Sequence, residues 1–352
     1  MGNVAAAETE TVPARDPAGA PVPTVDQTVP VFPRTDPKRK NPVARLVRSI
    51  KRHKVPYLFL LPTVIGMIVL QAAPILQGLY LGFLRSRKDK LLDYLSAPWA
   101  GFENYAEILF NPDSPIRSGL WDAVRNTALY TVAVTIGTLA VGTAAALMVN
   151  REFRFRAAAR TLMLFPWIVP TYVVGLLWGF LWQREVGLVN IVLVDWLHLF
   201  SVKPTWLIGP NTLWAIIIPT VWRQWPFSML MLLAGLQGIP KDVYEAAEID
   251  GANPWQAFRS ITWPLLKPVW AILILHGLIF NVYSFNIVIM MFGNGAGFPG
   301  KHGDLLMTDL FRNSFQMWDF GTGAAMSSLL MLAMMTLVFI WYRIFRDQLT
   351  GK

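Results

Sequence analysis

Cysteine is absent from the 352 residues of this chain. Disulfide bonds, zinc sites with thiolate ligands and cysteine nucleophiles are therefore excluded. Histidine is almost as scarce. The four histidines lie far apart and lack the spacing of metal ligands, so the sequence predicts no metal site: His53, His198, His276 and His302.

Charge is also in short supply. Charged residues make up 15% of the chain, against about 25% in ordinary soluble domains. Hydrophobic residues reach 54%, a composition that indicates a membrane protein. The net charge of +9 could suggest a nucleic-acid partner, but ten Lys and Arg stand within the first 54 residues. A basic flank beside an apolar segment is more simply a topology signal, so we expect no nucleic acid.

The N-terminal region lacks large apolar residues. Residues 1–42 contain eight prolines and cannot bury a core, so we expect them to be disordered. No apolar core follows the first Met closely enough for a cleavable signal peptide. We assign residues 1–54 to a cytoplasmic tail, 55–346 to a transmembrane domain and 347–352 to a second tail.

The chain has few charged residues but several long apolar segments. Six are long enough to cross a bilayer, which needs about 20 residues: Val55–Leu84, Thr127–Val149, Leu162–Trp182, Thr212–Leu236, Val269–Phe292 and Gly321–Tyr342. The shorter stretch Gly187–Phe200 carries Asn190, Asp195 and His198, and we interpret it as interfacial or re-entrant. The fold class is therefore an all-α membrane protein with six spans.

The distribution of Lys and Arg predicts the orientation. With six spans both termini share one side, which carries 19 Lys and Arg against ten on the other. The positive-inside rule then places both termini and the loop 238–268 in the cytoplasm. A second basic group, Arg85, Arg87, Lys88 and Lys90, opposes this on the outer side. We expect the outer segment Leu91–Trp121 to form a small cap.

Small residues are frequent in two spans. Gly137 and Gly142 stand in the second, and Gly175 and Gly179 give the third a GxxxG spacing. Such residues let helices approach closely in lipid, within this chain or against a partner.

Polar side chains in the fourth and fifth spans are candidates for a binding site. Arg223 and Gln224 lie between Trp222 and Trp225, and Pro226 predicts a kink. In the fifth span, Gly277, Asn281 and Ser284 follow helical spacing and share a face. Amides and hydroxyls beside aromatic rings suit a sugar. Hydrogen bonding between helices explains the same residues equally well.

The loop between these two spans has an unusual pattern. We expect Pro240 to open a helix with Val243, Ala246 and Ala247 on one face. Gly251 permits a left-handed stop, and Asn253 can cap a second helix that begins at Pro254. In that helix Trp255, Phe258 and Ile261 form an apolar stripe.

This loop, residues 240–268, resembles the EAA loop of ABC importer permeases. The family pattern is EAA, three residues, Gly, nine residues and Ile-x-Leu-Pro, and here it is met by Glu245-Ala246-Ala247, Gly251, Ile261 and Pro264. Trp263 stands where the family usually has Leu. The resemblance implies the type I importer permease fold and a coupling role for Glu245, Ala246, Ala247, Asp250, Gly251, Ile261 and Pro264.

Further stretches resemble sugar permeases of the maltose and glycerol-phosphate type: Gly101-Phe102-Glu103-Asn104-Tyr105, Trp121-Asp122-Ala123, Asn126-Thr127, Pro166-Trp167-Ile168-Val169-Pro170 and Asp319-Phe320-Gly321. The likeness covers roughly residues 55–346. In that group the helices on both sides of the EAA loop line the sugar site. The resemblance therefore implies a substrate site of Trp222, Arg223, Gln224, Phe227, Gly277, Phe280, Asn281 and Ser284. Phe227, Gly277 and Ser284 depart from the maltose pattern, and Arg223 would favour an anionic ligand.

The resemblance also implies partners and a cellular place. They are a second, similar permease subunit, two ATP-binding subunits that hold ATP and Mg²⁺, an extracytoplasmic solute-binding protein and membrane lipid, in a bacterial inner membrane. The segment Gly295–His302 nearly spells a phosphate-binding loop, but His302 replaces the required hydroxyl, and we interpret it as a turn. We expect no cofactor and no catalytic residue in this chain. An ion-coupled secondary transporter is the alternative; it would need intramembrane carboxylates, which the predicted spans lack. A membrane enzyme is less favoured still.

Overall fold

The computed structural model describes residues 54–90, 93–292 and 298–350. The chain divides into two units, residues 1–65 and 66–352, and of the first only the start of α2 is described. The Pro-rich tail and nearly all of the basic stretch before the first span lie outside the described residues. Some of the Gly-rich segment, residues 293–297, does so too. Its described end turns as expected, since Gly303 N donates to Gly300 O at 3.0 Å.

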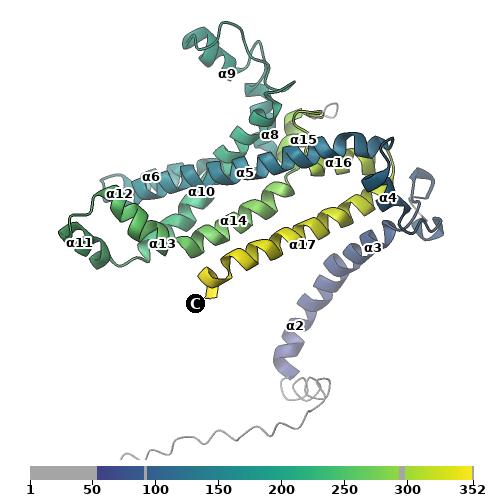
Figure 1. Cartoon of the computed structure of the whole chain (residues 1–352), viewed down its shortest axis with the longest axis horizontal. Coiled ribbons are helices and arrows are strands. Elements are labelled where there is room, and N and C mark those ends of the chain that lie inside the picture. Colours follow the sequence, from purple (N-terminus) through teal and green to yellow (C-terminus); the bar gives the residue numbers. More distant parts are fainter. Residues whose placement is uncertain (1–53, 91–92, 293–297, 351–352) are drawn as a thin grey trace, which may run out of the picture. The chain divides into compact units, whose positions relative to one another are not determined.

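Helices make up nearly all of the described chain, where a pair of isolated β-bridges are the only extended pairings. The helices, labelled where there is room in Figure 1, are α2 (Lys54–Met67), α3 (Ala73–Leu81), α4 (Glu103–Phe110), α5 (Pro115–Asn150), α6 (Arg156–Met163), α7 (Phe165–Ile168), α8 (Thr171–Leu181), α9 (Leu188–Asn190), α10 (Thr212–Gln237), α11 (Lys241–Ile249), α12 (Pro254–Ala257), α13 (Trp263–Leu265), α14 (Lys267–Val282), α15 (Asn286–Phe292), α16 (Leu306–Phe311) and α17 (Phe320–Thr350). Short π-helical stretches join several of them, among them Ile68–Ala72 between α2 and α3 and Phe258–Thr262 between α12 and α13.

Three helical segments are long and apolar enough to cross a membrane, and two bent helix pairs raise the number to at most five. The three are Lys54–Leu81, Gly119–Asn150 and Phe320–Leu349. Helix α10 has 26 residues but is not apolar enough to count as a membrane-spanning helix, because Arg223, Gln224 and their Trp neighbours interrupt its apolar run. Twelve of its residues are buried, so α10 lies inside the bundle, where polar side chains find partners. The number of six spans stays a prediction.

The third and fifth predicted spans are broken. Arg156–Ile168 and Thr171–Leu181 meet at 86°, at the point where Pro170 lacks the N–H that would continue the helix. The segment Val269–Phe292 is not one helix: α14 ends at Val282 and α15 begins at Asn286. By contrast, α10 continues through Pro219 and Pro226, so the kink expected at Pro226 does not break it.

The ends of other elements also differ from the predictions. Helix α5 begins at Pro115 rather than Thr127, and its 36 residues extend about 54 Å, well beyond a hydrocarbon core of about 30 Å. Helix α17 runs to Thr350, so residues 347–350 are helical, and the assignment of residues 347–352 to a cytoplasmic tail stays a prediction. Residues 188–196 form less than three turns of helix, too short to span, and the interpretation of Gly187–Phe200 as interfacial or re-entrant stays a prediction.

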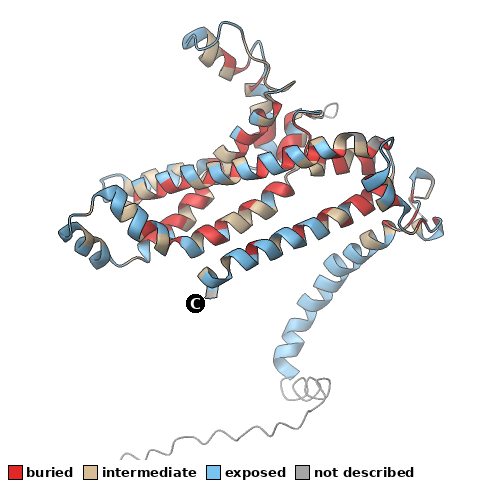
Figure 2. Cartoon of the chain, viewed as in Figure 1, coloured by how far each residue is buried: buried red, intermediate tan, exposed pale blue. Residues whose placement is uncertain are grey.

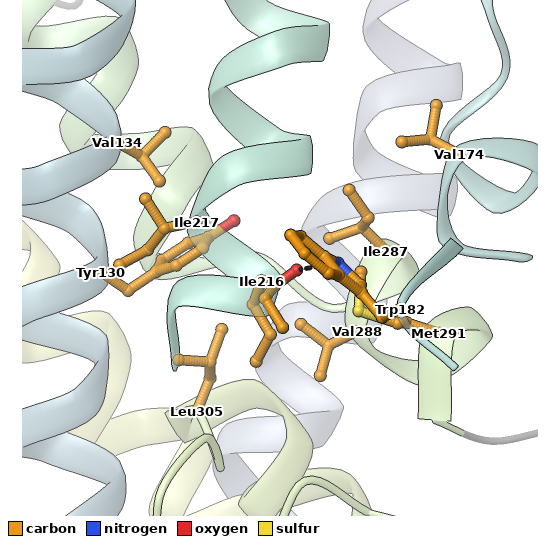
Figure 3. Packing of buried hydrophobic residues seen from close by; sticks show 11 residues of the cluster. Tyr130, Val134, Val174, Trp182, Ile216, Ile217, Ile287, Val288, Met291 and Leu305 are labelled. Atoms are coloured by element: carbon orange, nitrogen blue, oxygen red, sulfur yellow. Dashed lines mark hydrogen bonds between the residues drawn. The ribbon is translucent and has the colours of Figure 1, made fainter. Parts of the chain in front are cut away.

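A hydrophobic core joins α5, α8, α10 and α15. Figure 3 shows Tyr130, Trp182 and Ile216 from three of these regions packed together with Val288 and Leu305. The Trp182 Nε1 donates a hydrogen bond of 3.0 Å to the Ala215 carbonyl oxygen, which satisfies the one polar atom of the indole. This core holds the broken third span against α10.

Small residues permit the close helix contacts. A Cβ added to Gly175 would lie 2.7 Å from the Ile287 carbonyl oxygen, and one added to Gly179 would lie 2.8 Å from that of Met291. The GxxxG pair of α8 therefore packs against α15 within this chain. Gly137 and Gly142 serve α5 in the same way, against α10.

The motifs shared with sugar permeases tie loops together at one end of the bundle. The Asn104 Nδ2 donates to the carbonyl oxygens of Gly82 and Leu84, both at 2.9 Å, and Arg85 pairs with Glu103. A side chain at Gly321 would collide with the Leu84 carbonyl oxygen. The segment after α3, the start of α4 and the start of α17 thus meet here.

Candidate functional site

The loop between α10 and α14 is built from two short helices. Helix α11 starts at Lys241, with Pro240 at its N-cap and not at its first helical position as expected. Gly251 has φ +81°, the left-handed conformation that ends the helix. Asn253 caps α12: its Oδ1 accepts from Gln256 N at 2.9 Å, and Gln256 Oε1 accepts from Asn253 N at 2.7 Å.

This loop is largely exposed in the chain. Helix α11 contains no buried residue, as Figure 2 shows. Among the expected coupling residues, Glu245, Ala246, Asp250 and Gly251 are exposed, whereas Ala247, Ile261 and Pro264 are half-buried. Apolar side chains share the surface: Ile249 is 86% exposed and Trp255 67%. The loop thus presents exposed apolar side chains beside charged ones.

The two helices are fastened at their base. The Tyr244 hydroxyl lies 2.9 Å from the Thr262 Oγ1, a hydrogen bond between α11 and the π-helical stretch before α13. The Trp263 ring packs at a tilt against the Trp270 ring of α14, with centroids 4.8 Å apart. A displacement of α11 would therefore reach α14 through the residues that follow the loop.

The polar residues among the predicted substrate residues belong to two separate hydrogen-bonded groups of amides and hydroxyls. The Gln224 Nε2 donates to Asn281 Oδ1 at 3.2 Å, and Asn281 Nδ2 donates to Thr135 Oγ1 at 3.2 Å. Asn281 is fully buried. The Ser284 Oγ lies 2.9 Å from the Tyr130 hydroxyl, which also donates to Thr220 Oγ1 at 3.0 Å. These contacts join α5, α10 and α14, so hydrogen bonding between helices accounts for their present partners.

Aromatic rings from α7, α10 and α14 form a row. His276 stacks between Phe227 at 4.7 Å and Phe280 at 4.3 Å, measured between ring centroids. Phe227 also stacks on Trp167 of α7 at 5.9 Å. Phe280 is 60% exposed, so the row ends in an open apolar face.

Three predicted site residues point away from this row. The Arg223 Nε donates to the Val169 carbonyl oxygen at 3.3 Å, at the break between α7 and α8. Trp222 packs edge-on against Trp178 in the hydrophobic core. Gly277 faces α5: an added Cβ would lie 2.7 Å from Thr135 Oγ1. Its smallness thus brings α14 close to α5.

The sequence interpretation missed several participants. Thr135 and Tyr130 belong to α5, and no spacing rule links that helix to α10 or α14. The sequence interpretation considered His276 only as a metal ligand. In the structure its ring stacks between the rings of Phe227 and Phe280. Within the described residues, no group of three or more His, Cys, Asp or Glu side chains is arranged to hold a metal ion.

A buried charged cluster near α16 was also missed. Arg312 forms ion pairs with both Asp304 and Asp309, and its guanidinium lies 5.4 Å over the Phe298 ring. Thr308 Oγ1 donates to Asp304 Oδ1 at 2.6 Å. The Asn126 Nδ2 donates to the backbone oxygens of Lys301 and Asp304, at 3.0 and 3.1 Å, which anchors this segment to α5.

Comparison with known proteins places most of the chain in a family. The sequence pattern described as "Binding-protein-dependent transport system inner membrane component" matches residues 138–350, more than half of the protein. The chain belongs to this family.

Curated relatives agree with the assignment. This permease is 31% identical over 292 residues to the inner membrane ABC transporter permease protein YcjO of Escherichia coli, covering 82% of this chain and 94% of the relative. It is 31% identical over 296 residues to the trehalose/maltose transport system permease protein MalF of Thermococcus litoralis, covering 83% and 94%. It is 33% identical over 292 residues to the sulfoquinovosyl glycerol transport system permease protein SmoG of Agrobacterium fabrum, covering 83% and 90%.

A solved structure shows the same fold. A chain of a bacterial ABC transporter involved in the import of the acidic polysaccharide alginate superimposes with a TM-score of 0.72 at 23% identity, covering 86% of the permease and 99% of that chain. This likeness confirms the expected permease fold. The family match confirms the resemblance to ABC importer permeases.

Proposed function

We propose that this permease is the transmembrane subunit of an ATP-driven importer for a sugar or sugar-like solute, with ATP hydrolysed in partner subunits. The exposed pair of helices in the loop 240–268 carries the proposal. Ile249 and Trp255 leave an apolar surface uncovered beside Glu245 and Asp250. An ATP-binding subunit that covers this surface, with a basic residue opposite Glu245, would transmit its movement to α14 through Trp263 and Trp270.

The rest of the assembly follows from the family. A second, similar permease subunit, two ATP-binding subunits with Mg²⁺, and an extracytoplasmic solute-binding protein would complete the transporter. A related structure supports the last partner, since the alginate transporter was solved in complex with an alginate-bound periplasmic protein. The excess of Lys and Arg supports an inner-membrane orientation with both termini and the loop in the cytoplasm.

The substrate class rests on relatives and on the geometry of the site. The names of two relatives specify trehalose/maltose and sulfoquinovosyl glycerol, which are sugars or sugar conjugates. The aromatic row Phe227–His276–Phe280 can contact the apolar face of a sugar ring. Gln224, Asn281 and Ser284 can exchange their mutual hydrogen bonds for sugar hydroxyls as the helices separate. Trp222, Arg223 and Gly277 would act through the positions of the helices.

The coupling role can be tested with two substitutions in the assembled transporter, expressed with its partners. Glu245→Lys reverses the charge that faces the ATP-binding subunit. Gly251→Pro forces φ to about −65°, where the native value is +81°. We expect both variants to enter the membrane normally and to lose sugar uptake by about 30-fold or more, as for central interface residues. Uptake in membrane vesicles and the membrane-bound amount of the chain are the measurements.

Asp347→Lys is the matched control. Asp347 is also exposed and stands near the end of α17, outside the loop. We expect this variant to transport like the wild type. Wild-type uptake in Glu245→Lys or Gly251→Pro would refute the coupling role, and ion-dependent uptake without ATP would favour the secondary transporter instead.

A further inference from the structure

Residues 183–211 link α8 to α10 and form a small lobe with hydrogen bonds of its own. The Asn190 Nδ2 donates to the carbonyl oxygens of Arg184 and Pro204, at 2.9 and 3.0 Å. The Asn190 Oδ1 accepts from Trp206 Nε1 at 2.8 Å. In Figure 1 α9, which belongs to the lobe, projects beyond the end of α8 and away from α5. The lobe is therefore a folded element and not a loose connection.

The lobe is fastened to the ends of two predicted spans. It follows the third predicted span directly after Trp182, and it leads directly into α10 at Thr212. The Trp206 ring packs against the Trp182 ring, with centroids 4.7 Å apart, and Trp182 Nε1 donates to the Ala215 carbonyl oxygen of α10. Because no linker separates the lobe from either span, it is held close to the level where those spans leave the membrane.

Apolar side chains cover much of the lobe surface. The exposed ones are Val186, Leu188, Trp196, Leu197, Leu199, Phe200, Val202 and Ile208. Five of these eight lie within residues 196–202, where Trp196 is 67% and Leu199 63% exposed. The backbone N–H groups of Leu197 and Leu199 donate to carbonyl oxygens earlier in the lobe, both at 2.9 Å. Lipid offers few hydrogen bonds, so apolar side chains over a hydrogen-bonded backbone suit contact with lipid.

The charged residues of the lobe are paired with one another. There are two of each sign, so the lobe has no net charge with His neutral. The Lys203 Nζ lies 3.1 Å from Asp195 Oδ2 and donates to the Glu185 carbonyl oxygen at 3.2 Å. The Arg184 Nε lies 3.7 Å from Glu185 Oε1. Soluble proteins that bind and leave use complementary charge for their encounter, and this paired group offers them little.

The same charges limit how deep the lobe can lie. The Glu185 side chain is 76% exposed, and a carboxylate in that position needs water because a charge inside the hydrocarbon is costly. The lobe thus combines a hydrated charged group around Lys203 with an apolar stretch at residues 196–202. This combination is typical of an element that lies in the membrane interface.

We propose that the lobe is an interfacial anchor, with residues 196–202 among lipids of the outer leaflet and the charged group around Lys203 in water. Leu197, Leu199 and Phe200 reach the boundary between headgroups and acyl chains, about 5–10 Å deep. Trp196 lies at the level of the headgroups, where indole rings are enriched. Through Trp206 and Trp182 the anchor fixes the adjoining end of α10.

The absence of cysteine from this chain makes the depth of the lobe measurable. Leu197→Cys, Leu199→Cys and Glu185→Cys each replace an exposed residue. Each variant carries one nitroxide label in the assembled transporter, in liposomes and with the partners' cysteines replaced. Electron paramagnetic resonance measures collisions with oxygen, which concentrates in lipid, and with a nickel chelate, which stays in water. We expect the ratio of oxygen to nickel collisions to be several-fold higher at 197 and 199 than at 185, the matched control.

Other outcomes would overturn the anchor. Equal ratios at the three positions, with frequent nickel collisions, would show that the lobe stands in water. Exclusion of both reagents from 197 and 199 would show that the second permease subunit covers the stretch, and exclusion only after the solute-binding protein is added would make it a docking face for that protein. The leaflet rests on the orientation proposed above. The collision ratios do not depend on sugar uptake or on Glu245, so the anchor and the proposed function can fail separately.

Discussion

Polar residues inside the bundle also satisfy hydrogen-bonding groups of the backbone. Arg223 illustrates this. A charged side chain within a span suggested a ligand contact, yet its Nε donates to the Val169 carbonyl oxygen. That carbonyl precedes Pro170 at the break of the third span, where no following helical N–H is available. The Arg223 side chain therefore satisfies a backbone group that the bend leaves free.

Asp309 should make the stability of the folded chain depend on pH. It lies outside the three single spans and the two bent pairs. Burial raises the pKa of Asp309 from 3.8 to about 6; Arg312 opposes the rise and Asp304 adds to it. Because the folded chain then holds this proton more tightly than the unfolded chain, the stability that it contributes is complete below pH 3.8 and is lost as the pH rises through about 6. We expect the melting temperature in detergent to fall across this window, and Asp309→Asn to reduce the slope.

The control for this prediction is Asp113→Asn. Asp113 is exposed in the segment before α5, and its replacement should leave the pH dependence of the melting temperature unchanged. A wild-type slope in Asp309→Asn would show that another group is responsible.

Where the helices bend and end depends more on backbone breaks and close contacts than on the length of the apolar segments. The third span bends by 86° after Val169, and the fifth ends at Val282, after which α15 returns to pack on α8. Gly175 and Gly179 make that contact possible because carbonyl oxygens of α15 occupy the space of their missing side chains. The α8–α15 pair is thus a closely packed part of the core.

Gly179→Leu should disrupt this pair. The new side chain would meet the backbone of Met291, which cannot move aside as a flexible side chain can. Overpacking of this kind costs about 1–3 kcal/mol or more, and we expect a lower melting temperature and a smaller yield of folded protein. Gly78→Leu is the control, since no atom lies within 4 Å of a Cβ added there in α3. Equal melting temperatures for the two variants would contradict the assigned contact.

At the scale of the whole molecule, local patterns predicted the loop better than the spans. Gly251 and Asn253 act through their own backbone, so a single sequence suffices to place a left-handed stop and a capping box. The break at Val282 depends on how α15 packs against α8, and α5 begins early because α4 and α16 pack beside it. Thr135 became visible as a partner of Asn281 only when three helices were brought together.

The open aromatic face of α14 allows the substrate site to be tested apart from the fold. Phe280 is 60% exposed, so Phe280→Ala should leave the melting temperature unchanged while raising the KM for sugar uptake about tenfold, the loss of about 1.4 kcal/mol of ring contact. Asn281→Ala should lower both stability and uptake, because it leaves Gln224 and Thr135 without their partner. Phe339→Ala, an equally exposed Phe on α17, should change neither. An unaltered KM in Phe280→Ala would exclude this face from the proposed sugar pathway.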